Sequence, residues 1–180
     1  KVVAARGPSV VALVTGEGSG VVLRGFTITG GVGGASLGGG VTCAGSSPQL
    51  IDCVIESNSA ERGGGLLCSS VTEIVLLGCV FRNNVATGAS PDFPDGGGGV
   101  CLRDSLALLD ECTFEDNVAS KYGGGLLVTY DSHVQIMRTS FVGNAAGGGG
   151  AVLADGASQA VFKRCLVVSN LASEHGGGVS

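Results

Sequence analysis

The stretch FEDNVASKYGGG occupies residues 114–125, and its pattern recurs elsewhere in the chain. FRNNVA spans residues 81–86 and precedes the glycine run 96–99, and FVGNAAGGGG spans residues 141–150. Each copy holds a Phe, an Asn three residues later, an Ala two residues after the Asn, and then a glycine run. Self-similarity at a period of 20–50 residues is typical of solenoids, in which each repeat stacks on its neighbours. The sequence therefore predicts a repeat architecture.

The repeat can be placed in register from the column that is cysteine in most copies. The copies start at residues 26, 53, 79, 112, 139 and 165, so the steps between them are 27, 26, 33, 27 and 26 residues. The columns three residues before and two residues after this point are wholly apolar. The fifth following residue is Asn in all copies except the first, which has Gly31, and the seventh is Ala in all copies except the first.

Short stretches with alternating apolar residues, such as VTCAG and CTFED, predict strands of about three to five residues. No segment between glycine runs sustains the apolar stripe of a helix. The chain is thus expected to be all-β, a parallel β-helix of about six coils of roughly 26 residues, with equivalent residues about 4.8 Å apart. In such coils the Phe column stacks in the core, the Asn column forms a hydrogen-bonded ladder at a bend, and the glycines permit positive φ and close coil contact.

Seven cysteines, an odd number, lack the paired CxxC spacing of a zinc site. The main column, Cys53, Cys79, Cys112 and Cys165, is interpreted as small buried residues, although stacked coils also permit disulfides, so both redox states stay open. Cys43 and Cys68 predict a second column. Cys101 belongs to that column if Gly96–Gly98 is the aligned triplet, and it points outward if Gly97–Gly99 is.

Two longer stretches resemble known repeat families. GSGVVLRGFTITGG (18–31) and GGGVTCAGSSPQLIDCVIESNSAERGGGLLC (38–68) are similar to repeats of right-handed parallel β-helix proteins of the pectate-lyase-like superfamily. FRNN, FEDN and FVGN, with GGGL, GGGV and GGGA, resemble the FxxN and GGAI motifs of chlamydial polymorphic outer-membrane proteins, which are surface-exposed adhesins. This chain has GGG where GGA is usual. The resemblance implies a right-handed solenoid with either an adhesive or a carbohydrate-active role.

Composition excludes several classes of partner. The net charge of −5 and the absence of a long Lys/Arg cluster argue against nucleic acid, and no apolar run approaches the roughly 20 residues of a membrane-spanning helix. Residues 1–180 are interpreted as one β-helix segment, and because the chain begins at Lys1 and stops within a glycine motif, we expect it to be an internal piece of a longer protein. Its uncapped coils would then contact neighbouring domains or other subunits.

The sequence offers little chemistry. Six acids are expected to face outward, and none shares a column with another on an adjacent coil: Asp52, Glu56, Glu111, Glu115, Asp116 and Glu174. Arg24, Arg138 and Arg164 occupy similar places in their repeats, with Arg103 nearby, while His133 and His175 lack ligand partners. No glycine run matches a phosphate-binding loop. We therefore expect no catalytic residue, metal or cofactor.

One insertion breaks the repeat, over residues 87–95 between the third and fourth units. Loops that extend a solenoid often carry partner contacts, although a silent insertion stays open. The candidate binding residues are Ser90, Pro91, Asp92, Phe93, Pro94 and Asp95. The expected function is a non-enzymatic structural or adhesion scaffold of a cell-surface or extracellular protein that contacts protein subunits or glycans. The alternative is a carbohydrate-active β-helix.

Overall fold

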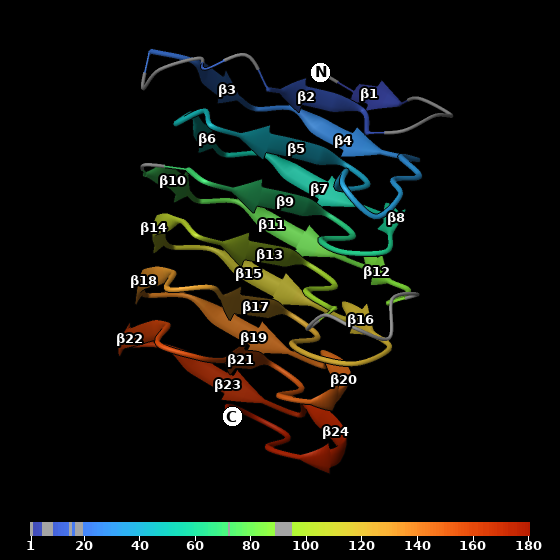
Figure 1. Cartoon of the computed structure of the whole chain (residues 1–180), viewed down its shortest axis with the longest axis vertical. Coiled ribbons are helices and arrows are strands. Elements are labelled where there is room, and N and C mark those ends of the chain that lie inside the picture. The colour runs from blue at the N-terminus through green and yellow to red at the C-terminus, as the bar shows by residue number, and fades with distance from the viewer. Residues whose placement is uncertain (1, 5–8, 15, 17–19, 72, 89–94) are drawn as a thin grey trace.

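The computed structural model describes residues 2–4, 9–14, 16, 20–71, 73–88 and 95–180. The chain winds into a solenoid whose coils stack along one axis, so that successive coils change colour from blue to red down Figure 1. Within the described residues there are 24 strands and no helix, and all paired strands run parallel. The all-β parallel solenoid expected from the repeat is thus confirmed.

Four sheets form the walls, and a complete coil passes through sheets C, A, D and B in that order. Sheet C contains β3(Val22–Arg24), β6(Gln49–Ile51), β10(Ile74–Leu77), β14(Leu106–Asp110), β18(His133–Met137) and β22(Gln159–Lys163). Sheet A contains β1(Val2–Ala4), β4(Thr27–Thr29), β7(Val54–Glu56), β11(Val80–Arg82), β15(Thr113–Glu115), β19(Ser140–Val142) and β23(Leu166–Val168).

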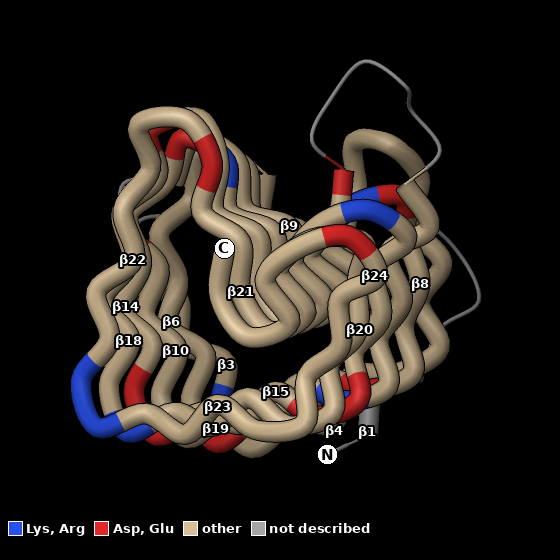
Figure 2. The backbone as a smooth tube through the Cα atoms, turned by 90° about the horizontal axis from the view of Figure 1, so that it is seen from below, with Lys and Arg blue, Asp and Glu red and all other residues tan. Residues whose placement is uncertain are grey.

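The other two walls complete each coil. Sheet D contains β8(Ser59–Ala60), β12(Val85–Ala86), β16(Val118–Ala119), β20(Ala145–Gly148) and β24(Leu171–His175). Sheet B contains β2(Val11–Leu13), β5(Val41–Ala44), β9(Leu66–Ser69), β13(Val100–Arg103), β17(Leu126–Thr129) and β21(Val152–Ala154). Viewed along the solenoid axis, the equivalent strands superimpose and the four walls enclose the core (Figure 2).

The strand register confirms the predicted columns. Leu76 pairs with Leu50 and Leu109 in sheet C, and Phe114 pairs with Phe81 and Phe141 in sheet A. The three Phe rings are fully buried and nearly parallel, with centroid separations of 5.0 and 4.7 Å. Apolar burial in every coil, rather than any single contact, stabilises the stack.

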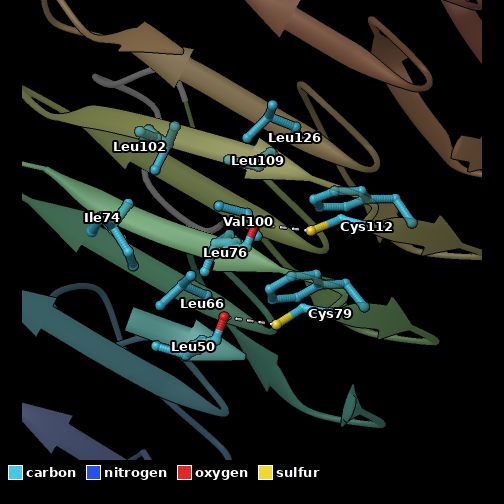
Figure 3. Packing of buried hydrophobic residues seen from close by; sticks show 14 of the residues in the cluster. Leu50, Leu66, Ile74, Leu76, Cys79, Val100, Leu102, Leu109, Cys112 and Leu126 are labelled. Carbon is cyan, nitrogen blue, oxygen red and sulfur yellow. Dashed lines mark hydrogen bonds between the residues drawn. The ribbon is translucent and has the colours of Figure 1, made fainter. Parts of the chain in front are cut away.

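The main cysteine column lies at the corner between sheets C and A and points inward. Cys79 and Cys112 are buried, and each thiol donates to a main-chain carbonyl of the preceding coil, that of Leu50 at 3.3 Å and that of Leu76 at 3.4 Å (Figure 3). All seven cysteines are free thiols in this structure. The sulfur atoms therefore act as small core groups whose weak donors are satisfied.

The predicted asparagine ladder is present and has one direction. Oδ1 of Asn117 accepts from both the main-chain N–H and Nδ2 of Asn84, and Nδ2 of Asn117 donates to Oδ1 of Asn144 at 2.9 Å. The same pattern joins Asn58 to Asn84 and Asn144 to Asn170. Each amide thus satisfies buried polar groups of the preceding coil.

A second ladder, of serines, lies at the corner between sheets B and C. The Ser105 hydroxyl accepts from Val71 N–H, the Ser132 hydroxyl accepts from Ser105 N–H, and the Ser158 hydroxyl accepts from Ser132 N–H, at 3.1 to 3.2 Å. This ladder is not among the sequence predictions, although Ser105, Ser132 and Ser158 each stand seven residues before the cysteine-column position of their unit.

The glycine runs bring neighbouring coils into close contact. A Cβ on Gly98 would lie 2.5 Å from the carbonyl oxygen of Gly124, and Gly97 has φ of +69°. Val100 pairs with Leu66, so the triplet that aligns with the other coils is Gly97–Gly99. Cys101 consequently pairs with Leu67 and Leu127 outside the main core, whereas Cys43 pairs with Cys68 inside it.

Candidate functional site

The insertion leaves and rejoins the wall at well-defined points. Before it, Thr87 N–H and Gly88 N–H donate to carbonyls of the preceding coil; after it, Gly96 bridges to Tyr122. Five of the six candidate binding residues, Ser90, Pro91, Asp92, Phe93 and Pro94, lie outside the described residues. The sixth, Asp95, is described. Both flanks of the insertion are thus built into the ladder.

Asp95 is fully buried at the end of the insertion. Its carboxylate accepts a hydrogen bond from Nε of Arg62 and lies 3.7 Å from Nζ of Lys121. Arg62 also donates from Nη1 to the carbonyl of Ala35 at 3.0 Å. A buried carboxylate is tolerated when it is paired and hydrogen-bonded. Asp95 therefore ties the insertion to the coils on both sides, and its side chain faces the protein rather than solvent.

The chain folds back between sheets D and B (Figure 2). A second, small cluster of apolar side chains packs outside the main core. It consists of Leu67, Cys101, Leu127 and Leu153, packed against Tyr122. Cys101 thus lies in the outward column of sheet B, as the second alignment predicted, but it is covered rather than exposed. Beside Tyr122 the surface is hollowed into a depression of about 260 Å³ that also includes Asp155 and His175.

The outer side of sheet C is a regular surface of six strands, and we call it the sheet C face. Its outward residues form three columns. The first contains Glu73, Leu106, His133 and Gln159; the second contains Val22, Gln49, Val75, Leu108, Gln135 and Val161; the third contains Arg24, Ile51, Leu77, Asp110, Met137 and Lys163.

Apolar side chains are prominent on the sheet C face. Leu106 is 46% exposed, and Val22 and Val161 are each 48% exposed. Around Leu108 the surface is hollowed into a depression of about 400 Å³ that includes His133. The Oδ1 atom of Asp110 is buried without a hydrogen-bond partner among the described residues. The face thus combines exposed apolar area with a buried carboxylate oxygen that has no hydrogen-bond partner among the described residues.

The two corners that flank this face carry opposite charge over the last coils. Asp104, Asp131 and Asp155 lie at the corner where the sheet C strands begin, and we call them the acidic edge. Arg138, Lys163 and Arg164 lie where these strands end, and we call them the basic edge. Figure 2 shows both red and blue segments at each end of the sheet C wall, because Asp110 and Glu111 also lie at the basic edge and Arg103 lies at the acidic edge.

The edges differ in how far their charges are neutralised. Arg138 pairs with Asp110 and Glu111, whereas Lys163 and Arg164 form no ion pair with another described residue. At the acidic edge the one described cation, Arg103, lies 4.8 Å from the centroid of the Tyr130 ring. Asp104 and Asp131 line the same depression of about 290 Å³ on adjacent coils. This acidic pair is not among the sequence predictions, although Asp104 and Asp131 each stand eight residues before the cysteine-column position of their unit.

Burial keeps three of the thiols protonated. Burial raises the pKa of Cys112 to about 11 and that of Cys101 to about 12, and burial also raises the pKa of Cys68. Such thiols remain protonated near neutral pH and are poor nucleophiles and metal ligands. Among the described residues no group of three His, Cys, Asp or Glu side chains could hold a metal ion.

Two of the arginines singled out from the sequence form exposed ion pairs across coils. Arg24 pairs with Asp52 at 3.5 Å, and Arg138 pairs with Glu111 at 3.0 Å. In the acidic column of sheet A, Arg82 lies between Glu56 and Glu115 and pairs with Glu56 at 2.7 Å. His133 and His175 are exposed. Exposed pairs of this kind contribute little to stability.

The family description "Right handed beta helix region" matches residues 10–179. The chain belongs to this right-handed β-helix family. The β-helix is also similar to the "Metabotropic glutamate receptor-like protein R" of Dictyostelium discoideum, with 29% identity over 140 residues. That match covers 76% of the β-helix chain but 8% of the Dictyostelium protein. No solved structure matches the chain significantly. None of the described segments is a helix long and apolar enough to cross a membrane.

Proposed function

We propose that this β-helix is a non-enzymatic structural or interaction scaffold of a cell-surface or extracellular protein. Regular ladders hold every wall of the solenoid in register, which favours a rigid spacer or platform. The receptor-like name of the Dictyostelium relative supports placement at a surface. The resemblance to chlamydial adhesin repeats and to pectate-lyase-like coils points the same way, towards contact with proteins or glycans.

Within this scaffold we propose that the insertion carries a partner contact, with Phe93 between two prolines at its centre. The observation that supports this is the anchoring of its flank by the buried carboxylate of Asp95, paired with Arg62 and Lys121. A loop held at its base loses less conformational entropy on binding than a free one, so its contacts yield more affinity. Aromatic side chains are among the groups that dominate such contacts.

The structure indicates how the insertion can be removed cleanly. Deletion of residues 88–94 joins Thr87 to Asp95, shortens the step from 33 to 26 residues, and leaves three residues between Ala86 and Gly97. The next coil has the same spacing between Ala119 and Gly123. Asp95 stays in place, so Arg62 keeps its buried partner.

The test compares this deletion with the parent chain on a glycan array and on cultured cells stained with the labelled protein. Loss of binding with an unchanged thermal midpoint supports the proposal. A matched control replaces residues 89–94 by Gly and Ser, keeping the length of the loop but removing Phe93 and both prolines, and it should also lose binding. If the deletion variant keeps every binding signal of the parent, the insertion is silent.

A carbohydrate-active β-helix is the second candidate. The depression shared by Asp104 and Asp131 favours it, because paired carboxylates are the usual catalytic groups of glycoside hydrolysis. A panel of uronic-acid polysaccharides, assayed for unsaturated or reducing ends, tests this function. Turnover that disappears in the Asp104→Asn and Asp131→Asn variants would replace the scaffold proposal, and no turnover on any polymer would leave the scaffold as the function.

A further inference from the structure

We propose that the sheet C face is a self-association surface on which a second copy of this chain docks, with the two solenoids side by side and pointing in the same direction. This names a partner for the proposed scaffold. It does not depend on what the insertion binds. Two features carry it: the apolar columns and the opposite charges of the two edges.

The sheet C face exposes large apolar side chains to solvent. Leu106 and Val161 are about half exposed, and Leu108 lies in the central column of the same face. Two sheets that pack face to face bury such side chains in a layer about 10 Å thick. Burying exposed apolar area provides the driving force for docking.

Charge selects both the partner and its orientation. When two copies face each other across a two-fold axis parallel to the solenoid axis, each strand lies over its equivalent in the opposite direction. The start of β22, with Asp155, then lies near the end of the partner copy's β22, with Lys163 and Arg164. The start of β18, with Asp131, likewise meets Arg138. Arg138 also pairs with Asp110, the last residue of β14, and with Glu111 of its own chain, so the positive charge of the basic edge that has no ion pair among the described residues lies at Lys163 and Arg164.

The opposite arrangement, with antiparallel solenoids, does not match charges in this way. Strand starts then face strand starts, so the acidic edge meets the corner before β10, where Glu73 lies, and the corner before β6, where Ser47 lies. The described residues at these two corners include no cation. Electrostatic complementarity therefore favours the parallel pair.

The size of the face sets the expected strength. Six strands about 4.8 Å apart and about five residues wide give a plan area of roughly 460 Å² per copy, below the roughly 800 Å² per partner of a standard interface. We therefore expect a reversible dimer with micromolar or weaker affinity. A two-fold pair also closes, whereas stacking through the ends of the solenoid would produce open-ended filaments.

Sedimentation velocity of the chain, from micromolar to several hundred micromolar, is the first measurement. A dimer that forms with rising concentration is expected, and Leu108→Lys should weaken it by about tenfold or more, because it places a charge in the centre of the interface. Val118→Lys is the matched control. Val118 is 43% exposed on the outer side of sheet D, and this variant should dimerise like the parent.

A charge exchange tests the orientation. Asp131→Lys with Asp155→Lys should weaken the dimer, and adding Lys163→Glu with Arg164→Glu in the same chain should restore it. An antiparallel pair would show no such rescue. A chain that stays monomeric throughout, or an oligomer that Leu108→Lys leaves unchanged, overturns the inference. A monomer whose sheet C face binds a glycan or a different protein overturns it as well. If the Leu108→Lys variant is monomeric and still binds the ligands of the parent, the dimer forms through the sheet C face and ligand binding does not require it.

Discussion

The asparagine ladder makes a stability prediction that can be worked out bond by bond. Replacing Asn117 by Ala removes an acceptor that serves two donors of Asn84, its main-chain N–H at 3.1 Å and its Nδ2 at 3.0 Å. Both donors are buried, so no solvent replaces the lost oxygen. An unsatisfied buried donor costs about 1–3 kcal/mol, and two of them give an expected destabilisation of about 4 kcal/mol.

Asn170 offers a matched comparison in the same ladder. Its Oδ1 also accepts from two donors of the preceding coil, those of Asn144, but Asn170 itself is half-buried in the last coil. Water can reach the vacated position. Asn170→Ala should therefore cost about 1 kcal/mol, the net value of an ordinary hydrogen bond.

Urea unfolding followed by far-ultraviolet circular dichroism measures both variants against the parent. The slope of free energy against urea should be the same in all three chains, since a changed slope indicates that coils unravel separately. The reasoning fails if Asn117→Ala costs less than about 1 kcal/mol, or if the two substitutions cost the same, because burial of the orphaned donors is then not the source of the loss.

Other substitutions test the packing. Gly98→Ala should destabilise the chain strongly in thermal melts, because its Cβ would lie 2.5 Å from a carbonyl oxygen of the next coil. The Cβ of Gly34→Ala would meet nothing within 4 Å, so this variant should melt like the parent. Equal effects of the two substitutions would contradict the close-contact argument. Phe114→Ala should cost about 4 kcal/mol in urea unfolding, because its ring is buried between two stacked rings, and a loss under about 2 kcal/mol would show that the core collapses into the gap. Alkylation at pH 8, followed by peptide mass spectrometry, measures the reactivity of each thiol. Cys165, which is half-buried, should react at least about a hundredfold faster than Cys101, whose pKa is raised by burial to about 12. Equal rates would show that the second apolar cluster opens readily.

The sequence predicted the ladders well because stacking makes each column a repeated local rule. Phe114 and Asn117 stand at fixed distances from Cys112, and one misaligned copy does not obscure five correct ones. The same rule also holds for two features that are not among the sequence predictions. Ser105, Ser132 and Ser158 stand seven residues before the cysteine column, and Asp104 and Asp131 stand eight residues before it, so the repeat alignment contains both columns.

Other features depend on contacts that no single repeat contains. The alignment of Cys101 depended on which three of four glycines form the triplet, and only strand pairing resolves that choice. The covering of Cys101 by the second cluster depends on how far the chain folds back between sheets D and B, which has no local sequence signal. The burial of Asp95 likewise requires Arg62 from the coil before and Lys121 from the coil after.

The direction of the asparagine ladder bears on how such a chain can grow by gene duplication. Gly31 has no side chain, yet its main-chain N–H donates to Oδ1 of Asn58 at 2.9 Å, so a unit with glycine at this position can precede an asparagine unit. The reverse order leaves the donors of the asparagine facing a residue that has no oxygen to offer. Copies of the unit around Asn84 or Asn117 can therefore be inserted anywhere after the first coil, whereas a copy of the Gly31 unit in the interior would break the chain of amides. Interior coils can multiply freely, and the glycine unit is confined to the upstream end of a run.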